Sequence, residues 1–297
     1  MSKDEIKRII AARAKIDGLT ETGIHGVQVF RATQEIPCVP AVYEPCVVSI
    51  VSGSKEVVLD GQRYVYNASQ YLCCPMSMPV KAGTPSASSE TPLYGALISL
   101  DRRVMTALAM EMEHAGSTPA ATKESLRAQG VRLAGWDRGF TEALLRLLQL
   151  TDNQTDMAVL GEARLRELLY AILKGDAGTL ARQAFGSGNA IARSIAHISS
   201  NLDVPVSIDD LANRAGMSRA VFHRKFKEAT TMAPIQFMKS MRLNNAAMKI
   251  AGGMTVNEAA LDVGYVSPSQ FSREFKRMYG QSPRQWGEAQ QVPFGVT

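Results

Sequence analysis

The sequence lacks the features that place a protein in a membrane or on a secretory route. No segment approaches the roughly 18 uncharged apolar residues that a membrane-spanning helix needs. Residues 1–17 mix acidic, basic and apolar side chains, so they contain no signal-peptide core. These absences predict a cytoplasmic protein with no membrane partner.

Cysteine and histidine are also scarce. The four cysteines are too few for a disulfide scaffold and lack the CxxC spacing of a zinc site. The four histidines are scattered, with no two at helical ligand spacing. The motifs GxSxG, GxxxxGK(S/T) and GxGxxG are missing as well. We therefore expect no metal, no cofactor, no catalytic residue and no enzymatic activity.

The positive charge is concentrated in the last third of the chain. The 297 residues are enough for two domains, and the formal net charge is +5. From residue 191 to the end there are 13 basic and 8 acidic residues, whereas residues 1–190 contain 20 of each. This distribution indicates either a polyanion-binding module joined to a second domain or simply a solvated basic surface.

The N-terminal part has the pattern of short strands after one helix. Residues 1–17 have the apolar spacing of an amphipathic helix. Asp60-Gly61 suits a type I′ hairpin turn, because both central residues of that turn need positive φ. Strands are expected at 47–51, 55–59, 62–66, 71–74 and 93–100. Strands at this spacing are typical of a small antiparallel β-barrel or sandwich.

From residue 101 onward the apolar spacing becomes helical. Helices are expected at 102–113, 138–150 and 156–174. The leucines from Leu144 to Leu150 form one apolar face, which either packs on the barrel or pairs two copies in a homodimer. The predicted fold class is therefore α+β with two domains. Residues 1–185 form the small barrel with packed helices, 186–190 the linker, and 191–297 an all-α domain.

One design occurs twice in the C-terminal part. SIDDLANRAGMSRAVFHRKFK runs from Ser207 to Lys227, and TVNEAALDVGYVSPSQFSREFK runs from Thr255 to Lys276. In each copy a Ser or Thr can cap a first helix, a glycine can end that helix, and a serine can cap a second one. These glycines are Gly216 and Gly264, and the second caps are Ser218 and Ser267. Such an arrangement is a helix-turn-helix unit.

The second helix of each copy has an aromatic face and a polar face. The inward phenylalanines are Phe222 and Phe226, then Phe271 and Phe275. The polar faces consist of Arg219, His223, Arg224 and Lys227, then Ser269, Gln270, Arg273 and Lys276. Arg can pair with guanine and Gln with adenine in the major groove. One such helix could be a solvated basic face, but two matching copies favour double-stranded DNA as the partner.

A single spacer helix is predicted between the copies. It runs from Pro234 to Ile250, with proline in its first turn. A helix of this length spans about 25 Å. It could hold both second helices on one face of DNA, where successive major grooves are about 34 Å apart. One monomer would then bind an asymmetric site of two half-sites.

The region from residue 190 to 286 resembles the DNA-binding domain of the AraC/XylS family of bacterial transcription regulators. The similarity is strongest in GYVSPSQFSREFKRMYGQSPRQW, which runs from Gly264 to Trp286. The resemblance implies sequence-specific DNA binding, control by an unknown small-molecule effector, and RNA polymerase as a further partner.

Individual site residues follow from this resemblance and from the polar faces. The expected base-contacting residues are Arg219, Ala220, His223, Arg224, Ser269, Gln270 and Arg273. The expected phosphate-contacting residues are Ser218, Lys227, Ser267 and Lys276. Arg224 and Arg273 should be the leading specificity residues.

The stretch from Tyr43 to Val80 is similar to the cupin-like sensor domain of one branch of the same family. In that family such domains bind small molecules or mediate dimerisation. Cys73 and Cys74 are candidate effector-sensing thiols if cationic neighbours lower their pKa. The alternative is two thiols in a strand, one of them inward as a small apolar residue.

Two other functions stay open at this point. The first is a cupin-type isomerase or oxygenase with a nucleic-acid-binding tether, which would need a metal site that the sequence does not display. The second is a nonspecific architectural DNA binder, which would not need base-reading side chains on groove-sized helices.

Overall fold

The structure, a computed structural model, describes residues 2–116, 130–186 and 188–289. The strands are β1 (Gly18–Glu21), β2 (Val27–Ala32), β3 (Ile36–Tyr43), β4 (Cys46–Ser52), β5 (Ser54–Leu59), β6 (Gln62–Asn67), β7 (Gln70–Cys74), β8 (Met78–Thr84), β9 (Leu93–Ser99) and β10 (Arg132–Gly135). The helices are α1 (Ser2–Arg13), α2 (Arg102–His114), α3 (Arg138–Gln149), α4 (Gln154–Lys174), α5 (Gly178–Phe185), α6 (Ala190–Ser199), α7 (Ile208–Arg214), α8 (Arg219–Thr230), α9 (Pro234–Ala251), α10 (Val256–Asp262), α11 (Pro268–Tyr279) and α12 (Pro283–Ala289).

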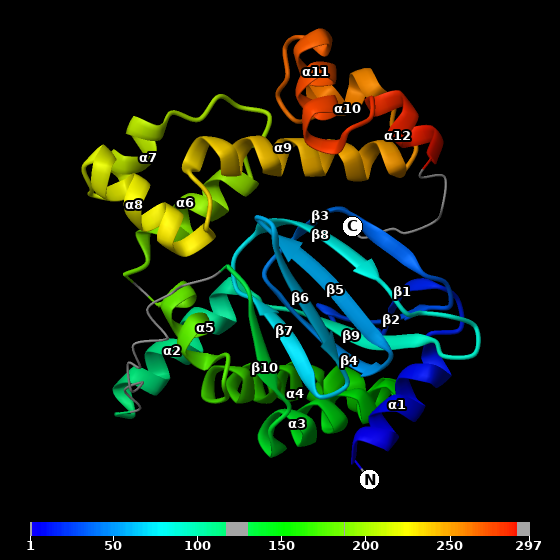
Figure 1. Cartoon of the computed structure of the whole chain (residues 1–297). Helices are drawn as coiled ribbons and strands as arrows, with labels where there is room; N and C mark the ends of the chain where they lie inside the picture. Colours follow the sequence, from blue (N-terminus) through cyan, green and yellow to red (C-terminus); the bar gives the residue numbers. More distant parts are fainter. Residues whose placement is uncertain (1, 117–129, 187, 290–297) are drawn as a thin grey trace.

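The N-terminal strands form two antiparallel sheets around one apolar interior. The six-stranded sheet has the order β1-β2-β9-β4-β7-β10, and the four-stranded sheet has the order β3-β8-β5-β6. The α+β class predicted from the sequence is confirmed, with the small barrel built as two facing sheets (Figure 1). Asp60 and Gly61 have φ values of 48° and 80°, as the predicted hairpin turn between β5 and β6 requires.

Several strands were not predicted, and prolines are the reason for two of them. Pro37 and Pro40 lie in β3, and Pro79 lies in β8. β3 is an edge strand, where a missing backbone N–H is tolerated. Pro79 pairs with Val42 beyond the part of β8 that pairs with β5, so it interrupts no ladder on that side. Strands β1, β2 and β10 were not predicted from the sequence either.

Helices α1, α3 and α4 lie along the outer face of the six-stranded sheet (Figure 1). Leu144, Leu147 and Leu148 of α3 are 0% exposed, so this leucine face is used for packing within the chain. The leucine face is therefore not available as a dimer interface, and the homodimer stays a prediction. α1 buries Ile6 and Ile10 in the same core cluster.

α9 joins the C-terminal helices to the N-terminal sheets (Figure 1). Its Asn244 is 3% exposed, and the Nδ2 atom donates hydrogen bonds to the carbonyl oxygens of Ala41 at 2.8 Å and Val80 at 2.9 Å. The Oδ1 atom accepts a hydrogen bond from the Tyr279 hydroxyl at 2.6 Å. One side chain thus connects β3 and β8 with the last residue of α11.

We expect Asn244→Ala to destabilise the protein by about 1–3 kcal/mol, because it removes three hydrogen bonds from a buried site. Denaturant unfolding of the full chain measures this. Asn245→Ala is the matched control on the same helix, since the Asn245 amide donates a hydrogen bond to the Met241 carbonyl one turn back and reaches neither strand. Equal loss in the two variants would contradict the role given to Asn244.

Candidate DNA interface

The first helix-turn-helix unit is built as its sequence predicts. The Ser207 hydroxyl accepts a hydrogen bond from the backbone N–H of Asp210 at 3.4 Å and caps α7. Gly216 turns the chain with φ of 65°, and the Ser218 hydroxyl then caps α8 through the backbone N–H of Val221. The two caps and the positive φ fix where α8 begins and hence which side chains face outward.

The second unit repeats this construction with a turn that is one residue longer, because five residues separate α10 from α11 and four separate α7 from α8. Thr255 and Glu258 form a reciprocal capping box at the start of α10. Gly264 has φ of 81°, and a Cβ atom there would lie 2.7 Å from the Leu202 carbonyl oxygen. Ser267 caps α11 by accepting from the backbone N–H of Gln270 at 3.2 Å. The turn therefore needs glycine for its conformation and for the close approach of the 202–203 backbone.

Two buried aromatic pairs orient the second helices. The side chains of Phe222, Phe226, Phe271 and Phe275 are all 0% exposed. The ring centroids are 5.5 Å apart in each pair. Because residues four apart share one helix face, each pair leaves the opposite face of its helix toward solvent. We call α8 and α11 the reading helices from here on.

On α8, most of the expected DNA-contacting residues are exposed. They are Ser218, Arg219, Ala220, Arg224 and Lys227, while His223 is half-buried. Arg219 forms an exposed ion pair with Asp209 of α7 at 3.2 Å. Arg224 has no ion pair with any residue in the described part of the chain. Its guanidinium is therefore the better placed of the two to meet a base.

On α11, Ser269, Gln270, Arg273 and Lys276 are exposed, and the cap Ser267 is half-buried. Glu274 was not expected as part of this surface. Its carboxylate accepts hydrogen bonds from the Gln270 amide at 3.2 Å and the Tyr265 hydroxyl at 3.0 Å. Although burial opposes it, these bonds and Lys239 of α9 hold the pKa of Glu274 below its ordinary value.

The C-terminal domain has two depressions whose charges differ, and one of them lies beside α11. A depression of about 450 Å³ is lined by Lys239, Gln270, Arg273, Glu274 and Arg277, so basic side chains dominate it. Sequence reasoning missed Lys239, which comes from another helix, and Arg277, which stands four residues after Arg273. The excess of cationic groups suits the phosphate backbone of a nucleic acid.

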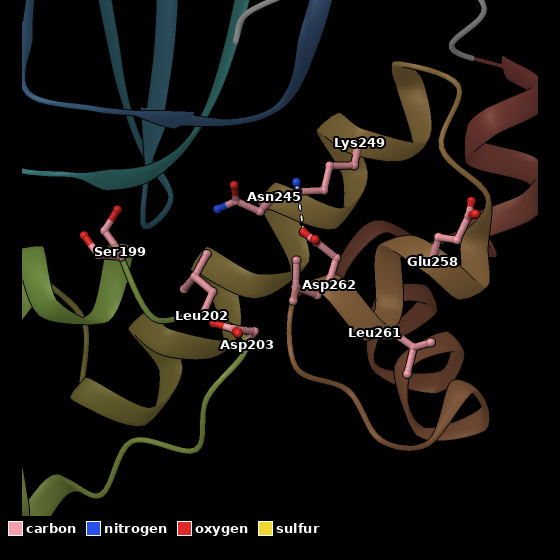
Figure 2. Close-up of a pocket in the computed structure, with 10 residues that line it drawn as sticks. Ser199, Leu202, Asp203, Asn245, Lys249, Glu258, Leu261 and Asp262 are labelled. Atoms are coloured by element: carbon pink, nitrogen blue, oxygen red, sulfur yellow. Dashed lines mark ion pairs between the residues drawn. The ribbon is translucent and has the colours of Figure 1, made fainter.

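The other hollow, of about 680 Å³, lies among the end of α6, the segment that follows it, α9 and α10 (Figure 2). Figure 2 shows Lys249 of α9 pointing at Asp262 of α10, with which it pairs at 2.9 Å. Asp203 and Glu258 also line the hollow. Acidic side chains outnumber the single lysine there, so this hollow is unsuited to phosphate.

Known protein families match both the N-terminal and the C-terminal part of the chain. Residues 211–289 match the family described as a helix-turn-helix domain. Residues 23–180, more than half of the chain, match the family described as AraC-type transcriptional regulator N-terminus. The chain belongs to the AraC-type transcriptional regulators.

Two relatives similar to the C-terminal part of the chain are named as regulators. The regulator is 32% identical to the regulatory protein SoxS of Escherichia coli (strain K12) over 90 residues, which cover 30% of this chain and 84% of SoxS. It is 37% identical to the HTH-type transcriptional regulator MtrA of Neisseria gonorrhoeae over 81 residues, which cover 27% of each protein.

Solved structures of ToxT from Vibrio cholerae show the same two-domain fold. An apo variant superposes with a TM-score of 0.56 at 14% identity, covering 92% of this chain and 99% of ToxT. ToxT bound to (E)-4-(8-methylnaphthalen-1-yl)but-3-enoic acid superposes with a TM-score of 0.57 at 12% identity, covering 88% and 97%. At these identities the likeness concerns the fold.

The candidate thiols of the regulator lie in a buried strand. Cys73 and Cys74 are both 0% exposed, because β7 is covered by the other sheet on one face and by helices on the other. Burial raises the pKa of Cys73 to about 12 and that of Cys74 well above its ordinary value. A reactive thiolate needs the opposite shift, so the structure does not support the sensing role.

In the described ranges no group of three or more His, Cys, Asp or Glu residues is placed to hold a metal ion. No helix among the described residues is both long and apolar enough to span a bilayer.

The two turn glycines give a prediction with an internal control. Gly264→Ala should destabilise the protein by more than about 2 kcal/mol, because positive φ costs roughly 1–2 kcal/mol and the new Cβ meets two backbone carbonyls. Gly216→Ala should carry the φ cost alone, because nothing lies within 4 Å of its Cβ position. Thermal unfolding of both variants measures the difference, and equal shifts would contradict the close approach at Gly264.

A second prediction concerns the thiols. We expect Cys73 and Cys74 not to react with a disulfide reagent such as DTNB at pH 8 in the native protein, because burial keeps both protonated. Both should react once denaturant unfolds the chain. Cys38 is the internal reference: burial raises its pKa too, to about 11, but its side chain is only half-buried, so it should react faster than Cys73 and Cys74. Rapid native labelling of Cys73 or Cys74, located by mass spectrometry, would restore the sensing hypothesis.

Proposed function

We propose that the regulator binds a specific asymmetric DNA site with both reading helices of one monomer. The observation that carries this proposal is the pair of exposed polar faces, each opposite two fully buried phenylalanines on a capped helix. A merely solvated surface would not need this construction twice.

The base contacts are assigned to the outward side chains. Arg224 and Arg273 read guanine through bidentate hydrogen bonds and lead the specificity. Gln270 reads adenine after its amide leaves Glu274, and Arg219 reads a base after it leaves Asp209. Ser269, His223 and Ala220 complete the base-contacting set, with Ala220 supplying an apolar contact.

Phosphate contacts are assigned to Lys227, Lys276 and the two cap serines. A cap hydroxyl oxygen accepts from a backbone N–H, so the hydroxyl proton of Ser218 or Ser267 is free to donate to a phosphate oxygen. The positive ends of the α8 and α11 dipoles add to the attraction. Lys239 and Arg277 extend this set beside α11.

The spacing of the two units supports simultaneous binding. α9 has 18 residues, which corresponds to about 27 Å. Figure 1 shows α7 and α8 near one end of α9, and α10, α11 and α12 over the other. Successive major grooves are about 34 Å apart, so bending of the DNA would bring both grooves to the reading helices.

We further propose that the N-terminal domain, taken as residues 1–185, receives a small-molecule effector, and that 186–190 joins it to the DNA-binding domain of 191–297. A solved structure of ToxT with bound unsaturated fatty acid is a precedent for ligand binding in this fold. RNA polymerase is the proposed protein partner, a homodimer the proposed assembly, and the cytoplasm the proposed location, because the DNA is there.

The regulatory function is proposed in place of the enzymatic one because both family matches are regulatory or DNA-binding families. It is proposed in place of nonspecific binding because the two units differ in side chains. A protein that only neutralises phosphates has no use for two different base-reading faces.

The experiment is a selection of bound sequences from a random DNA pool with purified full-length protein, followed by binding assays on the selected site. Arg273→Ala should weaken binding to that site by about 1–3 kcal/mol and relax the preference at one base pair. Lys276→Ala should weaken selected and random DNA alike and reduce the salt slope by about 1.

Arg284→Ala is the matched control, because Arg284 is exposed on α12 and pairs with Glu288 at 3.0 Å. It should leave the base preference unchanged. If Arg273→Ala weakened binding equally on selected and random DNA, the base-reading role would be wrong.

A further inference from the structure

The second reading helix is attached to α9 by directional polar contacts at two points. Tyr279, the last residue of α11, donates a hydrogen bond from its hydroxyl to the Oδ1 atom of Asn244 at 2.6 Å. Near the middle of α11, Glu274 pairs with Lys239 at 3.5 Å. Both contacts join residues that are 35 apart in sequence, so they connect the two helices in the same register.

The Glu274 carboxylate is held by more than the lysine. Its side chain is 13% exposed, and its Oε2 atom accepts a hydrogen bond from the Tyr265 hydroxyl at 3.0 Å. Tyr265 is 7% exposed and packs edge-on against Phe271, with ring centroids 5.2 Å apart. The contacts with Tyr265 and Lys239 do not depend on Gln270, so they would remain when its amide turns to a base.

The Tyr279 hydroxyl completes the bonding of a buried amide. Its ring centroid lies 4.6 Å from that of Phe275 and 5.7 Å from that of Trp286, so aromatic packing directs the hydroxyl at α9. Burial raises the pKa of Tyr279, so the hydroxyl stays protonated and donates. The same Asn244 donates to carbonyls of β3 and β8. The end of α11 is thereby fixed against both α9 and the four-stranded sheet.

The matching positions of the first unit carry other residues. In the aligned copies, Lys225 stands where α11 has Glu274, and Thr230 stands where α11 has Tyr279. Lys225 is exposed, and the Thr230 hydroxyl donates a hydrogen bond to the Phe226 carbonyl at 2.8 Å within α8 itself. The contacts of Glu274 and Tyr279 are therefore not a general requirement of the helix-turn-helix design.

Apolar packing holds α8 on α9. Phe226 meets Phe237 of α9 edge to face, with ring centroids 5.3 Å apart. Among the residues that the structure describes, no side chain of α8 forms a hydrogen bond or ion pair with α9. Because apolar packing is less directional than a hydrogen bond, α8 has more freedom to tilt than α11.

We propose that Glu274 and Tyr279 are positioning residues for base reading by α11, although neither is among the groups assigned to DNA. They fix the tilt and rotation of this helix on α9, so that Gln270 and Arg273 reach the base edges in one geometry. Bidentate pairing with a base needs distances and angles that a helix displaced by about 1 Å would lose. This inference rests on the proposed base contacts of α11.

The test uses the full-length protein and the DNA site selected from the random pool, with each base pair changed in turn. Arg224→Ala and Arg273→Ala identify the base pairs that lie under α8 and under α11. For each further variant, fluorescence anisotropy gives the ratio of the affinities for the selected site and for each changed site. Tyr279→Phe keeps the ring and removes the hydroxyl, whereas Glu274→Gln keeps the size of the side chain and removes its charge.

Tyr279→Phe should lower the affinity ratio about threefold to tenfold at the base pairs under α11 and leave the ratios under α8 unchanged. Glu274→Gln should act in the same direction but less, because its amide can still accept from Tyr265 and the lost contact with Lys239 is the longer one. In an Asn244→Ala background, Tyr279→Phe should cause no further loss, since the hydroxyl acts through that amide.

Thr230→Val and Lys225→Gln are the matched controls, because they change the same positions of the first unit. Both should keep the wild-type ratios under α11. Unchanged ratios under α11 in Tyr279→Phe would overturn the proposal, and so would an equal loss under both reading helices, which indicates general destabilisation. If Tyr279→Phe did not fold, unchanged ratios in Glu274→Gln would overturn it. The DNA-binding proposal is tested separately, because it depends on how Arg273→Ala affects selected and random DNA.

Discussion

The arrangement of the two domains depends on the packing of α9 against strands β3 and β8. Helix α9 belongs to the C-terminal domain, yet its Asn244 side chain is buried and bonded to two strand carbonyls. The same amide accepts a hydrogen bond from Tyr279 at the end of α11. A buried amide with three partners of good geometry has few alternative positions, so it specifies how the two domains meet. Both helix-turn-helix units are arranged about this one helix.

Local signals in the sequence were sufficient for the DNA-binding units. Caps, turn glycines and aromatic pairs each act over a few residues, so Ser207, Gly216, Thr255 and Ser267 could be assigned from spacing alone. The Asp60-Gly61 hairpin is equally local, and its positive φ values follow from residue type.

Features that depend on distant contacts could not be predicted. The partners of Asn244 are backbone carbonyls 203 and 164 residues away in sequence, which no residue pattern reveals. The Glu274 carboxylate accepts hydrogen bonds from a tyrosine nine residues away and a lysine 35 residues away in sequence. Alternation in a strand predicted one outward thiol in β7, but coverage of both faces buries Cys73 and Cys74 together. These outcomes were decided by which layers pack on which, and a local pattern does not contain that information.

The two reading helices present different side chains, and this difference has a consequence at promoters. α8 presents arginine and histidine, whereas α11 presents glutamine, arginine and a bonded glutamate, and α9 joins them in a fixed order. A chain with unlike halves can distinguish the two directions along a duplex. If both reading helices bind one site as proposed, inverting that site would turn the whole molecule end for end, so that the N-terminal domain would face upstream sequence in one case and downstream sequence in the other.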